Sequence, residues 1–131
     1  MNDGKKNMIF KDSKAIYLQI ADKICDDVMT GTLTAGSRIP SVREYAASVE
    51  VNANTVMRTY DYLAQQGVLF NKRGIGFFIS DDARDRIVET RRRSFLNDEI
   101  NYFFKQLNLL DISADDLVRM YADYCKNNAN K

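Results

Sequence analysis

An asparagine and an arginine, Asn54 and Arg58, stand four residues apart in the stretch 52–66. On a helix this spacing puts the two side chains on one face, one turn apart. An asparagine amide matches the edge of adenine, and an arginine guanidinium matches that of guanine. These residue types therefore favour contacts with DNA bases. The free N–H groups at the start of such a helix would also attract a phosphate.

A second group of polar residues lies between two short apolar runs, 68–70 and 77–79, whose residue types favour β-strands. The turn between the runs contains two cations followed by a glycine, namely Lys72, Arg73 and Gly74. Cations that displace counterions from phosphates drive binding to DNA, and glycine lets the backbone approach a sugar–phosphate chain closely. The pattern indicates a β-hairpin with a basic tip.

Each of these residues also has an interpretation that needs no DNA. An asparagine at a helix start usually caps the helix, and a single arginine is usually solvated. Only the combination of these residues with the basic hairpin favours a DNA-binding surface over those structural roles.

Three predicted helices precede the hairpin. Apolar residues four apart from Ile16 to Val28 indicate a helix of roughly 15 residues. The pattern Ser41-Val42-Arg43-Glu44 is a capping box that starts a short helix. After a tight break, Asn52 caps a third helix, which ends at Gly67.

The order of helix, short helix, tight turn, helix and hairpin is typical of a winged helix-turn-helix. In that fold the third helix enters the major groove, and the hairpin lies against the neighbouring backbone or minor groove. With Val56, Tyr60 and Leu63 facing the core, the solvent side of the third helix carries Asn54 and Arg58.

The C-terminal segment has a different character. From Asp81 to Asn130 there is neither glycine nor proline, and Ser113 starts a last helix. Apolar residues four and three apart form a narrow, coiled-coil-like seam that needs a partner. A second copy related by a two-fold axis would cover it in a four-helix arrangement. The predicted dimer contacts are Leu96, Ile100, Phe103, Phe104, Leu107, Leu110, Leu117, Tyr121 and Tyr124.

Two alternatives for this segment remain open. Its aromatic residues could line an effector site, although so short a segment encloses a ligand poorly and such stripes are more often core or interface. The run Arg91-Arg92-Arg93 is interpreted as part of a solvated, salt-bridged helix. The alternative is a phosphate contact near the domain junction, which alanine replacement of all three would test through the salt dependence of DNA binding.

Composition limits the function classes. The chain has 131 residues, 45% of them hydrophobic, a net charge of +1 and no histidine. Without histidine there is no His-based nucleophile pair, general base or metal site, so we expect neither an enzyme nor a cofactor. The first residues are polar, and no run reaches the ~20 apolar residues of a membrane span, so we expect a cytoplasmic protein that does not enter the membrane.

The predicted fold is mainly α with a small β-wing. A winged helix-turn-helix DNA-binding domain occupies residues 10–80, and a helical dimerisation domain with two helices occupies residues 81–131.

Five segments in one continuous order make the sequence similar to the DNA-binding domain of GntR-type bacterial transcription regulators. The segments are YLQI at 17–20, GTLTAGSRIPSVRE at 31–44, VNANTV at 51–56, Leu63 with GVL at 67–69, and RGIGFF at 73–78. The short helical C-terminus resembles that of the family's YtrA-type branch, which lacks the large effector domain of other members.

This resemblance implies a homodimeric winged-helix transcription factor, often a repressor of a neighbouring transport operon. It also implies that Arg43 contacts DNA from the first helix of the pair, and that Arg73 and Gly74 lie at the tip of the wing. Ala53 and Met57 stand at positions that are often basic in the family, so the family's usual operator sequence is not carried over.

Together, these inferences predict a sequence-specific transcription regulator, a repressor, that binds an inverted-repeat operator in double-stranded DNA as a homodimer. The alternative is a winged helix that serves as a protein-interaction module without DNA binding. The predicted DNA contacts are Ser41, Arg43, Asn52, Asn54, Thr55, Arg58, Lys72, Arg73 and Gly74. The sequence identifies no small-molecule effector.

Overall fold

The structure, a computed structural model, describes residues 14–129. Residues 10–13 and 130–131 of the predicted domains lie outside this range. The chain divides into two compact units, of which the first ends at Thr90 and the second begins at Arg91. Within the described range, no helix combines the length and the apolar character needed to cross a membrane.

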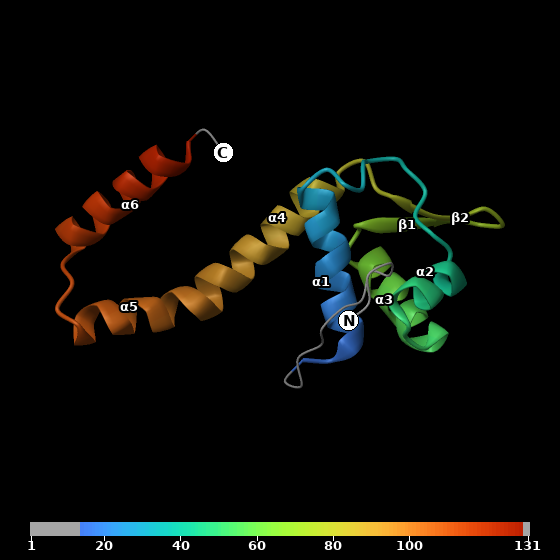
Figure 1. The fold of residues 1–131 in the computed structure, drawn as a ribbon, viewed down its shortest axis with the longest axis horizontal. Coiled ribbons are helices and arrows are strands. Elements are labelled where there is room, and N and C mark those ends of the chain that lie inside the picture. The colour runs from blue at the N-terminus through green and yellow to red at the C-terminus, as the bar shows by residue number, and fades with distance from the viewer. Residues whose placement is uncertain (1–13, 130–131) are drawn as a thin grey trace. The chain divides into compact units, whose positions relative to one another are not determined.

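The first unit is a winged helix-turn-helix, as predicted (Figure 1). Its two strands pair antiparallel, with Leu69 opposite Ile79 and Lys72 opposite Gly76. In Figure 1 the hairpin extends away from the cluster of three helices. The elements are α1 (Ile16–Met29), α2 (Val42–Val49), α3 (Ala53–Gln65), β1 (Leu69–Lys72), β2 (Gly76–Ile79) and the start of α4 (Ala83–Ser94).

The core of this unit is made by apolar residues of every element. The predicted inward residues Val56, Tyr60 and Leu63 are all buried. From α4, Ala83 and Ile87 are buried in the same core, because residues four apart share one helix face. This is why the first compact unit continues beyond residue 80. The division into functional domains at 10–80 and 81–131 stays a prediction.

The turn between α2 and α3 passes through a left-handed residue that is not glycine. Glu50 has φ of 57° and ψ of 50°, and the N–H groups of Glu50 and Val51 both donate to the carbonyl of Ala46. For residues with a Cβ this conformation carries a steric penalty that glycine avoids. The sequence predicts a tight break here but not its backbone conformation.

Relieving this strain is expected to stabilise the fold. Glu50→Gly and Glu50→Ala remove the same side chain, but only glycine adopts φ of 57° without a clash. We expect the free energy of unfolding of Glu50→Gly to exceed that of Glu50→Ala by about 1 kcal/mol. Urea denaturation of both variants measures this difference, and equal stabilities would contradict a strained turn.

The second unit contains η1 (Phe95–Glu99), α5 (Ile100–Leu109) and α6 (Ala114–Asn128), after the last residues of α4. As predicted, Ser113 caps the last helix, and its hydroxyl accepts from the N–H of Asp116 at 3.0 Å. The sequence pattern predicts helix before that cap but does not indicate a change of winding. The structure instead has a π-helical turn at η1, which includes the first seam residue, Leu96.

Candidate nucleic-acid interface

The start of α2 holds Arg43 in a capped helical turn. The Ser41 hydroxyl accepts from the N–H of Glu44 at 3.1 Å, and the Glu44 carboxylate accepts from the N–H of Ser41 at 2.9 Å. These hydrogen bonds with Ser41, assisted by the charge of Arg38, lower the pKa of Glu44. The predicted capping box is thereby confirmed. It fixes the turn from which Arg43 projects with an exposed side chain.

Two predicted contact residues, Asn52 and Asn54, lie at the start of α3. Asn52 is the N-cap, and its side-chain oxygen accepts from the N–H of Asn54 at 2.7 Å. Both asparagines are exposed, whereas Thr55 is half-buried. The structural role expected of Asn52 is therefore confirmed. The DNA contacts of all three residues stay predictions.

Arg58 is exposed on α3, but its guanidinium is held by α1. Its Cζ atom lies 4.0 Å from the centroid of the Tyr17 ring, a cation–π contact. Tyr17 in turn meets Tyr62 edge-on, with the ring centroids 6.0 Å apart. Spacing along α3 could not predict this contact, because Tyr17 belongs to a distant part of the sequence. Base contact by Arg58 stays a prediction.

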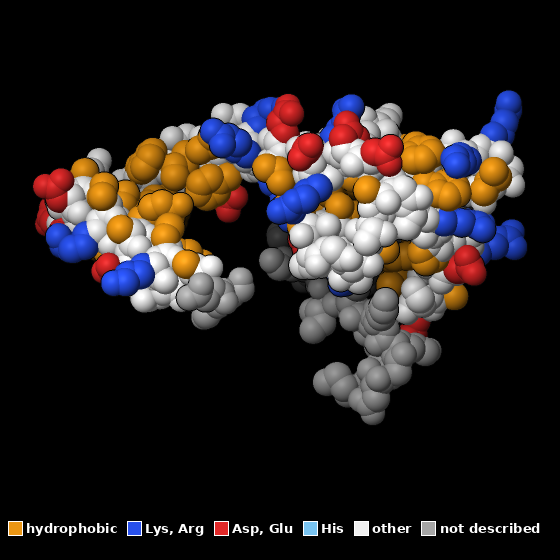
Figure 2. Space-filling view, turned by 90° about the horizontal axis from the view of Figure 1, so that it is seen from above, with side chains coloured by type: hydrophobic (Ala, Val, Ile, Leu, Met, Phe, Trp, Pro, Cys, Tyr) orange, Lys and Arg blue, Asp and Glu red, His pale blue; other side chains and the backbone are white. Residues whose placement is uncertain are grey.

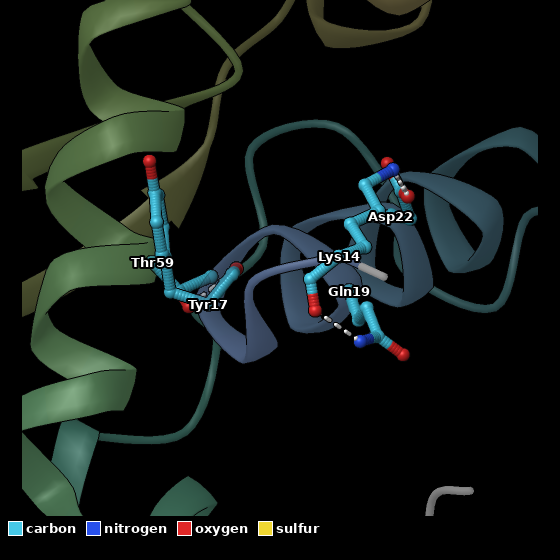
Figure 3. A network of polar contacts seen from close by, with 5 residues as sticks. All are labelled: Lys14, Tyr17, Gln19, Asp22 and Thr59. Atoms are coloured by element: carbon cyan, nitrogen blue, oxygen red, sulfur yellow. Dashed lines mark hydrogen bonds and ion pairs between the residues drawn. The ribbon is translucent and has the colours of Figure 1, made fainter. Parts of the chain in front are cut away.

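A buried hydroxyl fixes α3 against α1 (Figure 3). Thr59 is fully buried and donates to the carbonyl of Tyr17 at 2.8 Å. Figure 3 also draws Lys14 paired with Asp22 of α1, and the Gln19 amide donating to the carbonyl of Lys14 at 2.7 Å. Sequence reasoning missed Thr59 because threonine is usually exposed and gives no apolar signal.

Tyr60 joins α3 to the segment before α2 and to the wing. Its ring is fully buried, and its hydroxyl donates to the carbonyl of Pro40 at 2.7 Å. The ring meets Phe77 of β2 edge-on, with centroids 5.1 Å apart, and Tyr45 of α2 at 6.1 Å. One side chain therefore ties together α3, the wing and α2, the elements that carry the predicted DNA contacts.

This arrangement makes the protein sensitive to high pH. Burial, with Tyr45 and Glu44 nearby, raises the pKa of Tyr60, and burial raises the pKa of Tyr45 to about 12. An unfolded tyrosine titrates near pH 10. The folded state therefore holds these protons more tightly, so its stabilisation is complete below pH about 10 and is lost as the pH rises through the folded-state pKa values.

Tyr60→Phe removes both the hydrogen bond of the Tyr60 hydroxyl to the Pro40 carbonyl and the titration of that hydroxyl at high pH, and the pH of the measurement separates the two effects on stability. At pH 7 the variant leaves the Pro40 carbonyl without its donor, which should cost about 1–3 kcal/mol of unfolding free energy. Between pH 9 and about 12 its stability should decline less steeply than that of the wild type. Urea denaturation over this range measures both effects, with Tyr62→Phe as the control that keeps Tyr60. An undiminished decline in Tyr60→Phe would refute the assignment.

The wing presents its predicted cations on an ordered hairpin. The N–H of Ile75 donates to the carbonyl of Lys72 at 2.9 Å, and Gly74 has φ of +78°, which a glycine adopts freely. A Cβ at Gly74 would meet no atom within 4 Å, so backbone conformation is what requires glycine there. The Lys72 ammonium lies 4.7 Å from the centroid of Phe78. Arg73 and Ile75 are exposed, and sequence reasoning had not singled out Ile75.

All nine predicted DNA contacts thus belong to the first unit and to three of its parts: the start of α2, the N-terminal half of α3 with its N-cap, and the wing. Figure 2 shows basic side chains at the end of this unit that holds the hairpin. These are the parts that a winged helix-turn-helix directs at DNA. The individual contacts stay predictions.

The second unit exposes apolar side chains that lack a core of their own. No residue from 91 to 129 is buried. Of the predicted interface residues, Ile100, Leu107 and Leu117 are half-buried and the other six are exposed. Figure 2 shows hydrophobic side chains gathered on this C-terminal segment. The three arginines of the 91–93 run are also exposed.

The comparisons with known proteins agree with this arrangement. The family profile for bacterial regulatory proteins of the gntR family matches residues 16–79. The HTH-type transcriptional regulator YhcF of Bacillus subtilis is 36% identical over 109 residues, covering 83% of this chain and 88% of that protein. The HTH-type transcriptional repressor YtrA of the same species is 35% identical over 79 residues, covering 60% of this chain and 61% of that protein.

A solved structure gives a longer match. The crystal structure of a GntR-family transcriptional regulator from Bacteroides thetaiotaomicron is 50% identical in sequence and superposes with a TM-score of 0.76. The match covers 86% of this chain and 98% of that one, so it extends into the C-terminal helices.

Proposed function

Because the chain belongs to the GntR family of bacterial regulatory proteins, and is therefore a DNA-binding transcription regulator, we propose that it represses transcription as a homodimer on an inverted-repeat operator. The observation that carries this proposal is the pairing of two surfaces on one chain. One is the exposed start of α3 together with the basic wing of the same unit, and the other is an apolar helical segment without a buried core.

The first surface supports sequence-specific binding. The exposed Asn54 lies in the first turn of α3, where side chains of a recognition helix reach base edges in the major groove. Arg43 on α2 positions the protein and reads bases, and the wing cations Lys72 and Arg73 hold the sugar–phosphate backbone.

The second surface supports a homodimer. Large apolar side chains of the second unit, including Phe103 at 43% and Tyr121 at 66% exposure, are in contact with water in the single chain. A second copy presents the same surface, so a two-fold axis covers both at once. Four helices packed in this way provide the core that the second unit lacks in a single chain.

A two-fold dimer determines the form of the operator. Two recognition helices related by the axis read two inverted half-sites, whose centres are separated by about 34 Å or a multiple of that helical repeat. Repression is proposed because the relative YtrA carries the name of a repressor. A protein that binds the chromosome of a bacterium works in the cytoplasm, which is the location proposed here. The proposed function is regulation of transcription and includes no catalysed reaction.

Two measurements test the proposal together. Sedimentation of the protein on a duplex that carries its operator should give two chains per duplex, and scrambling one half-site should reduce the affinity sharply. Deleting the gene should increase transcription from the operator's promoter. One chain per duplex would contradict the dimer, and reduced transcription would contradict repression.

A further inference from the structure

The backbone of segment 38–40 is hydrogen-bonded both to the wing and to α3. On one side, the N–H of Ile39 donates to the carbonyl of Phe77 in β2 at 3.0 Å. On the other side, the carbonyl of Pro40 accepts from the hydroxyl of Tyr60 in α3 at 2.7 Å. The segment therefore lies between the two elements that, under the proposed function, enter neighbouring grooves of DNA.

Arg38 projects from this segment as an exposed cation with a defined position. Its backbone forms a bridge with Phe78, and its guanidinium lies against the backbone of Gly76. A Cβ on Gly76 would lie 2.9 Å from Nε and 3.3 Å from Nη2 of Arg38, so the guanidinium occupies the space that glycine leaves open. The charge of Arg38 also reaches Glu44 at the start of α2 and contributes to the lowered pKa of that carboxylate.

The geometry of duplex DNA dictates what passes over this position. The major and minor grooves are separated by a sugar–phosphate strand. When α3 occupies the major groove and the wing occupies the adjacent minor groove, that strand crosses the surface between them. The hydrogen bonds of segment 38–40 to β2 and α3 place it between these two elements. Ile39 is buried in the core, whereas Arg38 and Pro40 are exposed, and Arg38 is the cation of the segment.

We propose that Arg38 is a DNA-backbone contact whose guanidinium binds a phosphate of the strand that runs between α3 and the wing. The inference rests on the proposed DNA binding and adds to it a residue that neither the sequence motifs nor the recognition helix assigned. Guanidinium groups bind phosphate through paired, charge-assisted hydrogen bonds. The contact to Gly76 restricts the side chain before DNA arrives, which reduces the entropy lost on binding.

The salt dependence of binding provides a direct test with a matched control. Arg86 also lies against a glycine, since a Cβ on Gly67 would be 2.9 Å from its Cδ and Nη1, but it belongs to α4 rather than to the segment between α3 and the wing. Arg38→Gln and Arg86→Gln each remove one cation that covers a glycine. Their affinities for operator and unrelated duplexes are measured by fluorescence anisotropy between about 50 and 300 mM salt.

Arg38→Gln should reduce the slope of log affinity against log salt by about 0.9, the value for one lost phosphate contact. At about 0.1 M salt this corresponds to roughly eight-fold weaker binding, by similar factors for both duplexes. Arg86→Gln should keep the wild-type slope. An unchanged slope for Arg38→Gln overturns the proposal. This holds even if the affinity falls, because a loss of affinity without a change of slope would mean that Arg38 orders the wing and does not bind a phosphate.

Folding of the variants is checked by circular dichroism. If Arg38→Gln does not fold, the wild-type protein is tested on operators that carry single neutral methylphosphonates. Neutralising at least one phosphate of the strand between the two grooves should lower the DNA affinity of the wild type about eight-fold. The same neutral phosphate should lower the affinity of Arg38→Lys by a similar factor, since lysine keeps the cation. No sensitive position in that strand overturns the proposal. Failure of the wild type to bind any duplex would refute the proposed function itself.

Discussion

Phe103→Glu is expected to convert the dimer into monomers and to weaken operator binding by about 100-fold or more. Phe103 is 43% exposed in the single chain, so the substitution leaves the fold of one chain intact. In the dimer the same carboxylate would be taken into an apolar interface without a partner, and burial of an unpaired charge is strongly unfavourable. Each monomer would then bind a single half-site and lose the gain from two linked contacts.

Asn101→Glu is the matched control for this experiment. Asn101 lies two residues before Phe103, on the opposite side of α5, and is also exposed. The Asn101→Glu substitution adds the same single negative charge outside the predicted seam. The variant should therefore remain dimeric and bind the operator with an affinity within about two-fold of that of the wild type. Analytical ultracentrifugation gives the oligomeric state. A dimeric Phe103→Glu would show that the interface lies elsewhere.

Arg43→Ala is expected to cost about 1–3 kcal/mol of specific binding, or about five- to 150-fold in affinity. Arg43 projects from the capped first turn of α2, where the Ser41–Glu44 hydrogen bonds hold the backbone. An arginine on a rigid turn forms a guanidinium contact with little loss of entropy. Removing it should therefore weaken the complex without changing the stability of the free protein.

The specificity of the effect is measured by titrating operator and unrelated duplexes. Lys23→Ala removes an exposed cation from α1, where Lys23 pairs with Asp27 at 2.8 Å, and should leave both affinities unchanged. If Arg43 contacts a base, the operator loses more affinity than the unrelated duplex. If it contacts a phosphate, both lose affinity by the same factor. Wild-type affinity of Arg43→Ala for the operator would refute the assignment.

The fold of the first unit was predictable because its signals are local. A capping box, an asparagine N-cap and the glycine after α3 mark helix ends within a few residues, and the apolar periodicity identifies the buried faces. The predicted element order and the burial of Val56, Tyr60 and Leu63 are accordingly confirmed.

The features that sequence reasoning missed depend on contacts between distant residues. The cation–π contact of Arg58 needs Tyr17 from α1, and the buried hydroxyl of Thr59 needs the carbonyl of the same residue. The position of Arg38 depends on a bridge to β2, which no pattern within 32–40 indicates. The π-helical turn at η1 was missed because a five-residue change of winding alters apolar spacing too little to be recognised.

The measurement that tests the central claim most directly is fluorescence anisotropy of the full chain on the DNA upstream of its own gene. The titration is performed at about 50 and 200 mM salt, with an unrelated duplex of equal length. The account predicts tight binding to the upstream fragment, much weaker binding to the unrelated duplex, and a steep loss of affinity at the higher salt because phosphate contacts contribute strongly. Absence of binding to either duplex at both salt concentrations would contradict it and favour a winged helix that docks to protein.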